Sequence, residues 1–326
     1  MANHIANLEI ENYKSLRKVR MDCDRINLIV GKPNVGKSNL LEALALLGPN
    51  FLNNGDGFGR PQIRYEQAAN LYYDQSFYST AIEILASGVG RVTISSDKSA
   101  FHYEMTRPDT GTVSALFQMN GIVHSFNVPS DTLQSQVKFY QFPEKQQFKL
   151  LGQWPFLLPP DGANLPEIIL INRPIRQEIS DLFEPYGLHL YVKGDRLDVA
   201  KTQDGVLFET PFSLVADTLR RYMFHFAAVE SNRDSILLFE EPESHNYPPY
   251  ITRLAHRIIE EDTNQYFITT HSPFLFNTLV EEAKDVAVFL VEYEAFQTKV
   301  RRLSEDNLRD MLDYGLNIFT EQDFFV

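Results

Sequence analysis

The octapeptide GKPNVGKS at residues 31–38 constrains this chain more than any other part of its sequence. It follows the apolar run INLIV at 26–30 and precedes the leucine-rich stretch NLLEALALL. The short β-branched run predicts a buried strand, and the leucines at helical spacing predict a helix. A glycine loop between a strand and a helix points backbone N–H groups and the helix N-terminus at an anion. The segment therefore predicts a phosphate-binding loop.

The loop matches the pattern G-x-x-x-x-G-K-[ST] at every fixed position. In this pattern the lysine, Lys37, reaches the β- and γ-phosphates, and the hydroxyl of Ser38 helps to hold Mg²⁺. The predicted nucleotide-binding residues are Gly31, Pro33, Asn34, Val35, Gly36, Lys37, Ser38 and Asn39. The loop alone does not distinguish a kinase from a GTPase or an ATPase.

Two glutamates follow a second apolar run, ILLF at 236–239. Carboxylates at the end of a buried strand are costly unless they meet a cation or a water molecule that they activate. We therefore predict that Glu240 helps to hold Mg²⁺ and that Glu241 polarises the attacking water as a general base. A strand predicted at 266–270 ends at His271, whose imidazole can contact a γ-phosphate oxygen. Glu241, Lys37 and His271 are the predicted catalytic residues.

The 326 residues carry 30 Lys and Arg against 43 Asp and Glu, a net charge of -13. This balance excludes a protein whose whole surface wraps nucleic acid, because such a surface needs clustered cations. Local cations that nucleic acid could contact are Lys14, Arg17, Lys18 and Arg20, the pair Arg173 and Arg176, and the pair Arg301 and Arg302. The single cysteine, Cys23, excludes an internal disulfide. Since no signal peptide or bilayer-length apolar run is visible, we expect a cytoplasmic protein without a membrane partner.

Strand and helix signals alternate at both ends of the chain, which favours a mostly parallel sheet covered by helices. Between them, short β-type runs at 81–128 are separated by turn residues and predict an antiparallel meander. A helix is predicted over 212–229. The predicted segments are 1–48 with the phosphate loop, 49–145 with a loop and the meander, 146–234 as the helical lobe, and 235–326 with the acidic strand end and His271.

Five segments together resemble the ABC-type ATPase heads of the SMC family: LEIENYKSLRKV, GKPNVGKSN, PPDGANLPEIIL, FEEPESHNYP and TTHSPFL. They are also similar to the small bacterial AAA-annotated branch of that group and to the ATPase half of overcoming-lysogenization-defect (OLD) nucleases. The resemblance implies one α/β P-loop head, residues 1–326, with a mostly parallel core sheet, an antiparallel β-subdomain and a helical lobe. It also implies ATP and Mg²⁺ as cofactors and ATP hydrolysis as the activity.

The resemblance implies roles for individual residues as well. Glu240 stands where the family has the metal-side carboxylate of the Walker B motif, Glu241 where it has the catalytic base, and His271 where it has the switch histidine. Gln141, which ends a strand predicted at 138–142, is a candidate metal ligand by position only. His245 stands where the family has a histidine in its D-loop.

One motif departs from the family. Its signature motif has a Ser-x-Gly core ahead of a helix, but this chain has Ser213, Val215 and Asp217 in that region. An aspartate near a γ-phosphate repels it, so the departure puts the nucleotide contact from a second subunit in doubt. The rate of ATP turnover is open for the same reason.

The resemblance implies a homodimer that closes around ATP and couples this step to DNA or to a separate effector protein, a nuclease or toxin, in bacterial anti-phage defence. The chain ends soon after the ATPase core, so we expect no topoisomerase-primase (Toprim) nuclease domain in it. An ATP-bound scaffold that holds a partner effector, with little or no turnover, is the alternative.

Overall fold

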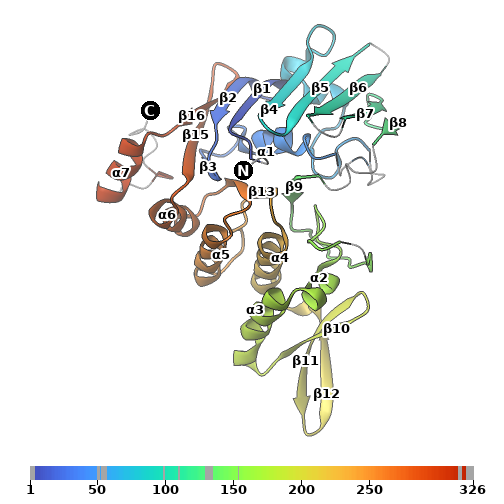
Figure 1. The fold of residues 1–326 in the computed structure, drawn as a ribbon, viewed down its shortest axis with the longest axis vertical. Coiled ribbons are helices and arrows are strands. Elements are labelled where there is room, and N and C mark those ends of the chain that lie inside the picture. The colour runs from blue at the N-terminus through green and yellow to red at the C-terminus, as the bar shows by residue number, and fades with distance from the viewer. Residues whose placement is uncertain are drawn as a thin grey trace.

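A computed structural model describes residues 4–49, 52, 57–97, 100–108, 111–128, 135–152, 154–314 and 318–320 of the chain. Two sheets lie one above the other in the upper part of Figure 1, helices cover the lower face of the second sheet, and a smaller lobe extends below them. Among the described residues, no helix combines the length and the apolarity that a bilayer crossing needs.

The lower sheet, which we name the core sheet, has the strand order β16, β15, β3, β14, β13, β9. Its strands are β3 (Ile26–Val30), β9 (Val137–Tyr140), β13 (Ile236–Glu240), β14 (Gln265–Thr269), β15 (Val286–Glu294) and β16 (Gln297–Arg302). All are parallel to their neighbours except β16, which runs antiparallel to β15. The segments that follow β3, β9, β13 and β14 therefore meet at one edge, where ligands of open α/β sheets bind. The prediction of an α/β fold with a mostly parallel core sheet is confirmed.

The upper sheet is antiparallel and has the strand order β2, β1, β4, β5, β6, β7, β8. Its strands are β1 (Asn7–Tyr13), β2 (Leu16–Asp22), β4 (Ile82–Ala86), β5 (Gly90–Ser96), β6 (Phe101–Arg107), β7 (Gly111–Phe117) and β8 (Val123–Asn127). The meander predicted at 81–128 supplies five of these strands, and the hairpin before the phosphate loop supplies the other two. The division into four segments by residue number stays a prediction.

Helix α1 (Lys37–Ala45) lies between the two sheets. Its side chains Leu40, Leu41 and Leu44 are fully buried and share one hydrophobic core with residues of both sheets. Successive strand residues point to opposite faces, so Leu238 of β13 enters this core while Leu237 enters a second one on the other face. Burying each leucine contributes about 1.5–3 kcal/mol, and this packing fixes α1 and the phosphate loop against the core sheet.

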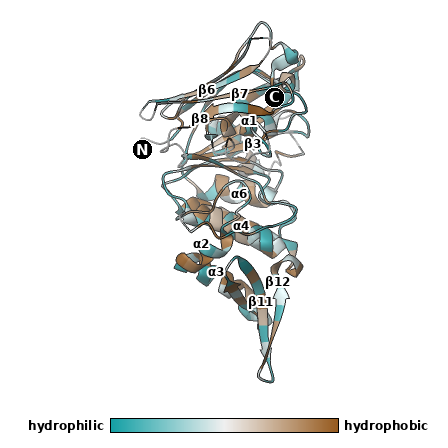
Figure 2. Cartoon of the chain, turned by 90° about the vertical axis from the view of Figure 1, so that its right-hand side faces the viewer, coloured by the Kyte–Doolittle hydropathy of each residue, from teal (hydrophilic) through white to brown (hydrophobic). Residues whose placement is uncertain are grey.

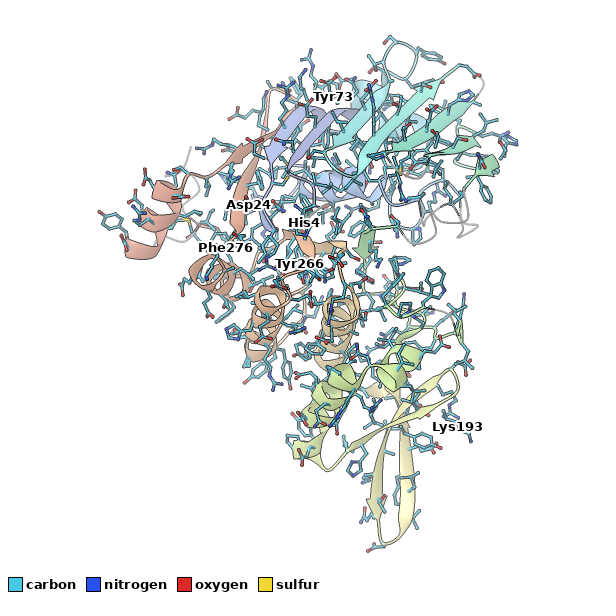
Figure 3. All side chains as sticks on the ribbon, in the orientation of Figure 1. His4, Asp24, Tyr73, Lys193, Tyr266 and Phe276 are labelled. Atoms are coloured by element: carbon cyan, nitrogen blue, oxygen red, sulfur yellow. The ribbon has the colours of Figure 1, made fainter. Side chains whose placement is uncertain are left out.

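The second core lies under α4 (Asp217–Ser231), α5 (Pro248–Glu260) and α6 (Pro273–Glu282). Beyond it, α2 (Leu165–Ile171), α3 (Arg173–Phe183) and a sheet of β10 (His189–Lys193), β11 (Arg196–Gln203) and β12 (Val206–Pro211) form the distal lobe. Helix α4 contacts both α2 and α3. Figures 1 and 2 show the lobe projecting from the rest of the molecule, and Figure 3 marks Lys193 within it and Tyr266 in the core sheet. The last described helix is α7 (Glu305–Tyr314).

Helix α4 begins later than the predicted start at residue 212. Residues Phe212–Leu214 form a 3-10 turn, and Val215 follows with an extended backbone at φ -68° and ψ 145°. The buried ring of Phe212 packs 5.9 Å from that of Phe148 and holds the turn against the lobe. The α-helix then starts at Asp217, an acidic residue whose charge suits a helix N-terminus.

Candidate nucleotide-binding site

The phosphate loop joins β3 to α1 and packs closely against β15 and β16. A Cβ atom at Gly31 would lie 2.2 Å from the main-chain oxygen of Val291, and one at Gly36 would lie 2.2 Å from Oγ1 of Thr298. Gly36 also has a φ of 104°, in the left-handed region. The Thr298 hydroxyl donates to the carbonyl of Val35 at 2.7 Å. The two glycines of the sequence pattern are therefore required by contacts within this chain.

The side chain of Lys37 folds over its own loop. Its ammonium group donates to the main-chain oxygens of Gly31, at 2.8 Å, and Lys32, at 2.9 Å. Burial lowers the pKa of Lys37, while the nearby carboxylates of Glu241 and Glu240 act to raise it. An ammonium group held over a glycine loop is placed to pair with phosphate oxygens.

The residues predicted to hold Mg²⁺ meet across the site. The hydroxyl of Ser38 donates to Oε1 of Glu240, which ends β13. Within the described ranges, no group of three or more His, Cys, Asp or Glu side chains could hold a metal ion by itself. Mg²⁺ is commonly bound by one or two protein oxygens together with nucleotide phosphates and water. A hydroxyl and a carboxylate oxygen at this position fit such an ion.

A charged network behind this pair was not predicted. Nε of Arg64 lies 2.8 Å from Oε1 of Glu42, and its Nη2 lies 3.3 Å from Oε1 of Glu240. Glu42 is 1% exposed and also forms an ion pair with Lys14. Tyr13 donates to the same carboxylate at 3.2 Å. One signal was available, a glutamate among the leucines of α1, since a buried carboxylate needs cationic partners.

The two predicted catalytic residues beyond the loop lie side by side. Nε2 of His271 lies 3.5 Å from Oε1 of Glu241, and both side chains are partly exposed. Glu241 has a φ of 44°, and its N–H donates to the carbonyl of Thr269 at 3.0 Å. Burial lowers the pKa of His271, the charge of Lys37 lowers it further, and Glu241 opposes both. The net shift favours the neutral imidazole.

Glu243 supports this pair and was not predicted. Its Oε1 accepts hydrogen bonds from the Thr270 hydroxyl at 2.8 Å and from the main-chain N–H of His271 at 2.7 Å. Its Oε2 is buried without a hydrogen-bond partner. Burial raises the pKa of Glu243, against the effect of these donors. Within residues 240–243, Glu240 and Glu241 thus face the candidate site, whereas Glu243 holds the backbone at the end of β14.

The remaining predicted residues take varied positions. Gln141 follows β9 at the same sheet edge as Glu240, because Tyr140 pairs with Phe239 in the parallel register. The main-chain N–H of Gln141 donates to Pro160 at 2.9 Å. Asn39 turns inward, and its amide donates to the Ser15 hydroxyl at 2.8 Å. Pro33 and Asn34 are exposed, and Val35 is buried.

The signature region lies at the start of α4. Its Asp217 carboxylate is paired on both oxygens, with Nη2 of Arg220 at 3.0 Å and Nε of Arg221 at 2.7 Å. Next to it, the Thr218 hydroxyl donates to the main-chain oxygen of His245 at 2.9 Å. Ser213 is exposed and Val215 is half-buried. The charge of Asp217 is therefore balanced within α4, and the helix is tied to the segment that follows Glu241.

Two sequence families match the chain. The family described as AAA ATPase domain matches residues 4–89. The family described as "AAA domain, putative AbiEii toxin, Type IV TA system" matches residues 116–277. No protein of curated function matches the chain.

Solved SMC heads share the fold. An SMC head bound to the C-terminal winged-helix domain of ScpA has a TM-score of 0.53 at 15% identity, over 93% of this chain and 99% of that one. A second head with an extended coiled coil, bound to the C-terminal domain of ScpA and derived from Pyrococcus furiosus, has a TM-score of 0.52 at 14% identity, over 95% and 99%. Two AAA families therefore match separate parts of the chain, and its fold is that of SMC heads.

Proposed function

We propose that the chain binds ATP with Mg²⁺ and hydrolyses it at the carboxyl edge of the core sheet. The observation that carries this proposal is the contact of Ser38 with Glu240 beside the pair of Glu241 and His271. Segments far apart in the sequence bring these groups to one edge of the sheet. The adjacent loop requires glycine at positions 31 and 36. Phosphoryl transfer depends mainly on such positioning and charge, so this set of groups supports the proposal.

Each side chain has a proposed role. Lys37 exchanges its carbonyl partners for phosphate oxygens, and Ser38 and Glu240 hold Mg²⁺, which when bound neutralises charge on the phosphates. Glu241 orients the attacking water and accepts its proton. The imidazole of His271 lies beside Glu241 and donates a hydrogen bond to the γ-phosphate. Gln141 stays a candidate metal ligand, and the inward Asn39 fixes the loop.

We also propose that two copies close around ATP. The nucleotide edge of one copy lies open to solvent at Glu241 and His271, which are 43% and 38% exposed, so a second copy has access to it. The charge balance at Asp217 removes the repulsion that the sequence suggested, because Arg220 and Arg221 accompany the carboxylate.

The test uses Glu241→Gln, which keeps the shape of the site but removes the base. With ATP and Mg²⁺ we expect this variant to elute as a dimer by size exclusion with light scattering, and phosphate release to fall about 100-fold or more. The matched control is Lys37→Ala in the same background, which should lose ATP and stay monomeric. A Glu241→Gln protein that binds ATP in equilibrium dialysis yet stays monomeric at every concentration would exclude the dimer.

The scaffold remains the second candidate. Ser213 and Val215 provide no signature core, and an Asp217 held by two arginines contributes less to a phosphate contact than a free hydroxyl. Wild-type protein that binds ATP but releases no phosphate, alone or with its neighbouring gene products, would favour a structural role for the nucleotide.

We propose a separate effector protein as the partner, in bacterial anti-phage defence and in the cytoplasm, with DNA as the competing partner. Several cations considered for DNA already have acidic partners within the chain. Lys14 pairs with Glu42, Lys18 with Glu11 at 2.7 Å, Arg20 with Glu9 at 3.3 Å, and Arg302 with Asp24 at 2.5 Å. This pairing favours a protein partner. Binding of duplex DNA that weakens steeply with salt would reverse that preference.

A further inference from the structure

The distal lobe exposes four aliphatic side chains far along the chain from the nucleotide site. Leu170 and Ile171 end α2 and are 52% and 64% exposed. Leu150 and Leu151, in the loop ahead of α2, are 58% and 40% exposed. Single exposed aliphatic residues are normal, but a contiguous group marks an interaction site. Figure 2 shows the hydrophobic colouring of α2 at the margin of the molecule.

Two hydrogen bonds hold the loop that carries Leu151 to helix α2. The Glu167 carboxylate accepts from the N–H groups of Leu151, at 2.9 Å, and Gly152, at 2.8 Å. Residues 167, 170 and 171 lie on one face of α2, because side chains three and four positions apart are neighbours on a helix. The loop is therefore held to the helix face that carries Leu170 and Ile171. We name Leu150, Leu151, Leu170 and Ile171 the aliphatic patch.

Cations border the aliphatic patch. Exposed Lys149 precedes Leu150, and exposed Arg173 lies two residues after Ile171. Nη1 of Arg176 donates to the carbonyl of Leu170 at 2.7 Å, which places a guanidinium group at the C-terminus of α2. On the other side, a Cβ at Gly194 would lie 4.0 Å from Leu150, so the turn that follows Lys193 adjoins the patch. Figure 3 shows Lys193 on this lobe.

Acidic groups also lie near these cations. The carboxylate of Glu167 is already bonded to two N–H groups, and Asp195 is the other acid at the β10–β11 turn. The chain as a whole has a net charge of -13, so a basic rim around an apolar surface is a local exception. Such a rim selects an acidic partner, since complementary charges set partner choice and orientation.

We propose that the aliphatic patch docks an acidic amphipathic helix of a separate partner protein. Four aliphatic side chains match the i, i+3, i+4, i+7 anchors of such a helix, and the basic rim matches acidic residues beside that stripe. A second copy of this chain is the poorer occupant, because a two-fold contact would bring the two basic rims together. Nucleic acid is poorer still, because the aliphatic side chains have no partner on it.

The aliphatic patch is connected to the proposed nucleotide site through packed helices. Helix α2 packs on α4, and the start of α4 is bonded to the carbonyl of His245, just after Glu241. This inference rests on the proposed function only in assigning the partner to an effector. The docking itself needs no ATP.

The probe is a synthetic amphipathic helix of about 18 residues, five turns, with a leucine stripe flanked by glutamates and a fluorescent label. We expect it to bind wild-type protein in an anisotropy titration. Leu170→Ser with Ile171→Ser should weaken it about tenfold or more, as should replacement of the flanking glutamates by lysines. The matched control, Val206→Ser with Leu207→Ser, removes two aliphatic side chains of similar exposure from β12 and should bind normally.

The outcomes separate this inference from the ATPase proposal. Lys37→Ala should bind the peptide as wild type does, so loss of ATP binding leaves the docking result readable. Equal affinity for the glutamate and lysine peptides, or no effect of the patch variant, overturns the proposal. So does a nucleotide-free dimer that the patch variant abolishes, since the occupant is then a second copy. Sedimentation of wild-type protein, but not of the variant, with vesicles of phosphatidylcholine and phosphatidylglycerol would assign the patch to a membrane surface instead.

Discussion

The carboxylate of Glu243 accepts a hydrogen bond from the main-chain N–H of His271 at 2.7 Å. The side chain thereby positions the backbone of a proposed catalytic residue without reaching the nucleotide edge itself. Its second oxygen is buried without a partner, so the carboxylate is retained at some cost in desolvation.

Glu243→Ala should therefore lower the ATPase rate and the stability together. The Thr270 hydroxyl and the His271 N–H lose their shared acceptor, which costs about 1–3 kcal/mol in the free energy of unfolding. Glu243→Gln keeps an acceptor oxygen for both donors and should retain most of the activity. Steady-state kinetics and urea denaturation of both variants check this, and equal loss in the two would show that the charge matters instead.

Lys14→Met should destabilise the fold by about 3 kcal/mol, the lower end of the range for a broken buried ion pair. Its partner Glu42 is 1% exposed and, among the residues that the structure describes, would keep only Arg64 as a cationic partner. Adding Glu42→Gln should recover part of the loss, because the uncompensated charge is then gone. Chemical denaturation of the single and double variants measures the coupling, and strictly additive losses would rule out this account.

Gly36→Ala should abolish ATP binding and destabilise the loop. The new methyl group would meet Oγ1 of Thr298 at 2.2 Å and Oγ of Ser15 at 2.7 Å, in a residue with a φ of 104°. Gly205→Ala is the matched control, since Gly205 has a φ of 77° but no atom within 4 Å. Thermal unfolding with and without ATP should show a small loss for the control and no ATP-dependent shift for Gly36→Ala.

His225 should make the protein less stable in mild acid. Burial lowers the pKa of His225 to about 4, against 6.5 for the unfolded chain, although a hydrogen bond to the Arg221 carbonyl opposes the shift. Between these pH values the unfolded state binds a proton that the folded state does not. Stability is therefore complete above pH 6.5 and falls as the pH drops toward 4, by about 3 kcal/mol.

His225→Gln does not titrate and keeps a donor for the Arg221 carbonyl. Between pH 6.5 and 4, the free energy of unfolding of this variant should fall less than that of the wild type, and the difference should be about 3 kcal/mol. Parallel pH profiles for the two proteins would mean that carboxylates alone cause the acid loss.

The local parts of the site were predictable and the long-range parts were not. The spacing of Gly31, Gly36 and Lys37 predicts a phosphate-binding loop, and Glu240 directly follows a run of four apolar residues. Each of these residues could therefore be predicted from its neighbours in the sequence. Arg64 reaches Glu240 from a loop with no periodicity, and no local pattern links positions 176 residues apart.

The fold divides in the same way. Alternating strands and helices predicted the core sheet, and short runs with turns predicted the meander. The pairing of β1 with β4, which joins the N-terminal hairpin to the meander, depends on a tertiary contact across residues 14–81. The late start of α4 depends on the burial of Phe212. This packing contact cannot be predicted from the helical spacing of apolar residues.

The position of β3 sets the order in which a ribosome can complete this protein. Ile26 pairs with Tyr266 on one side and with Val286 on the other, so the phosphate loop leaves the ribosome long before either neighbour has been synthesised. Meanwhile β1, β2 and β4–β8 can pair with strands close in sequence, which is the faster kind of contact to form. Both edges of β3 must be kept from wrong partners until then. A nascent chain can therefore complete the core sheet around β3, and with it the proposed nucleotide site, only after β14 and β15 have been synthesised.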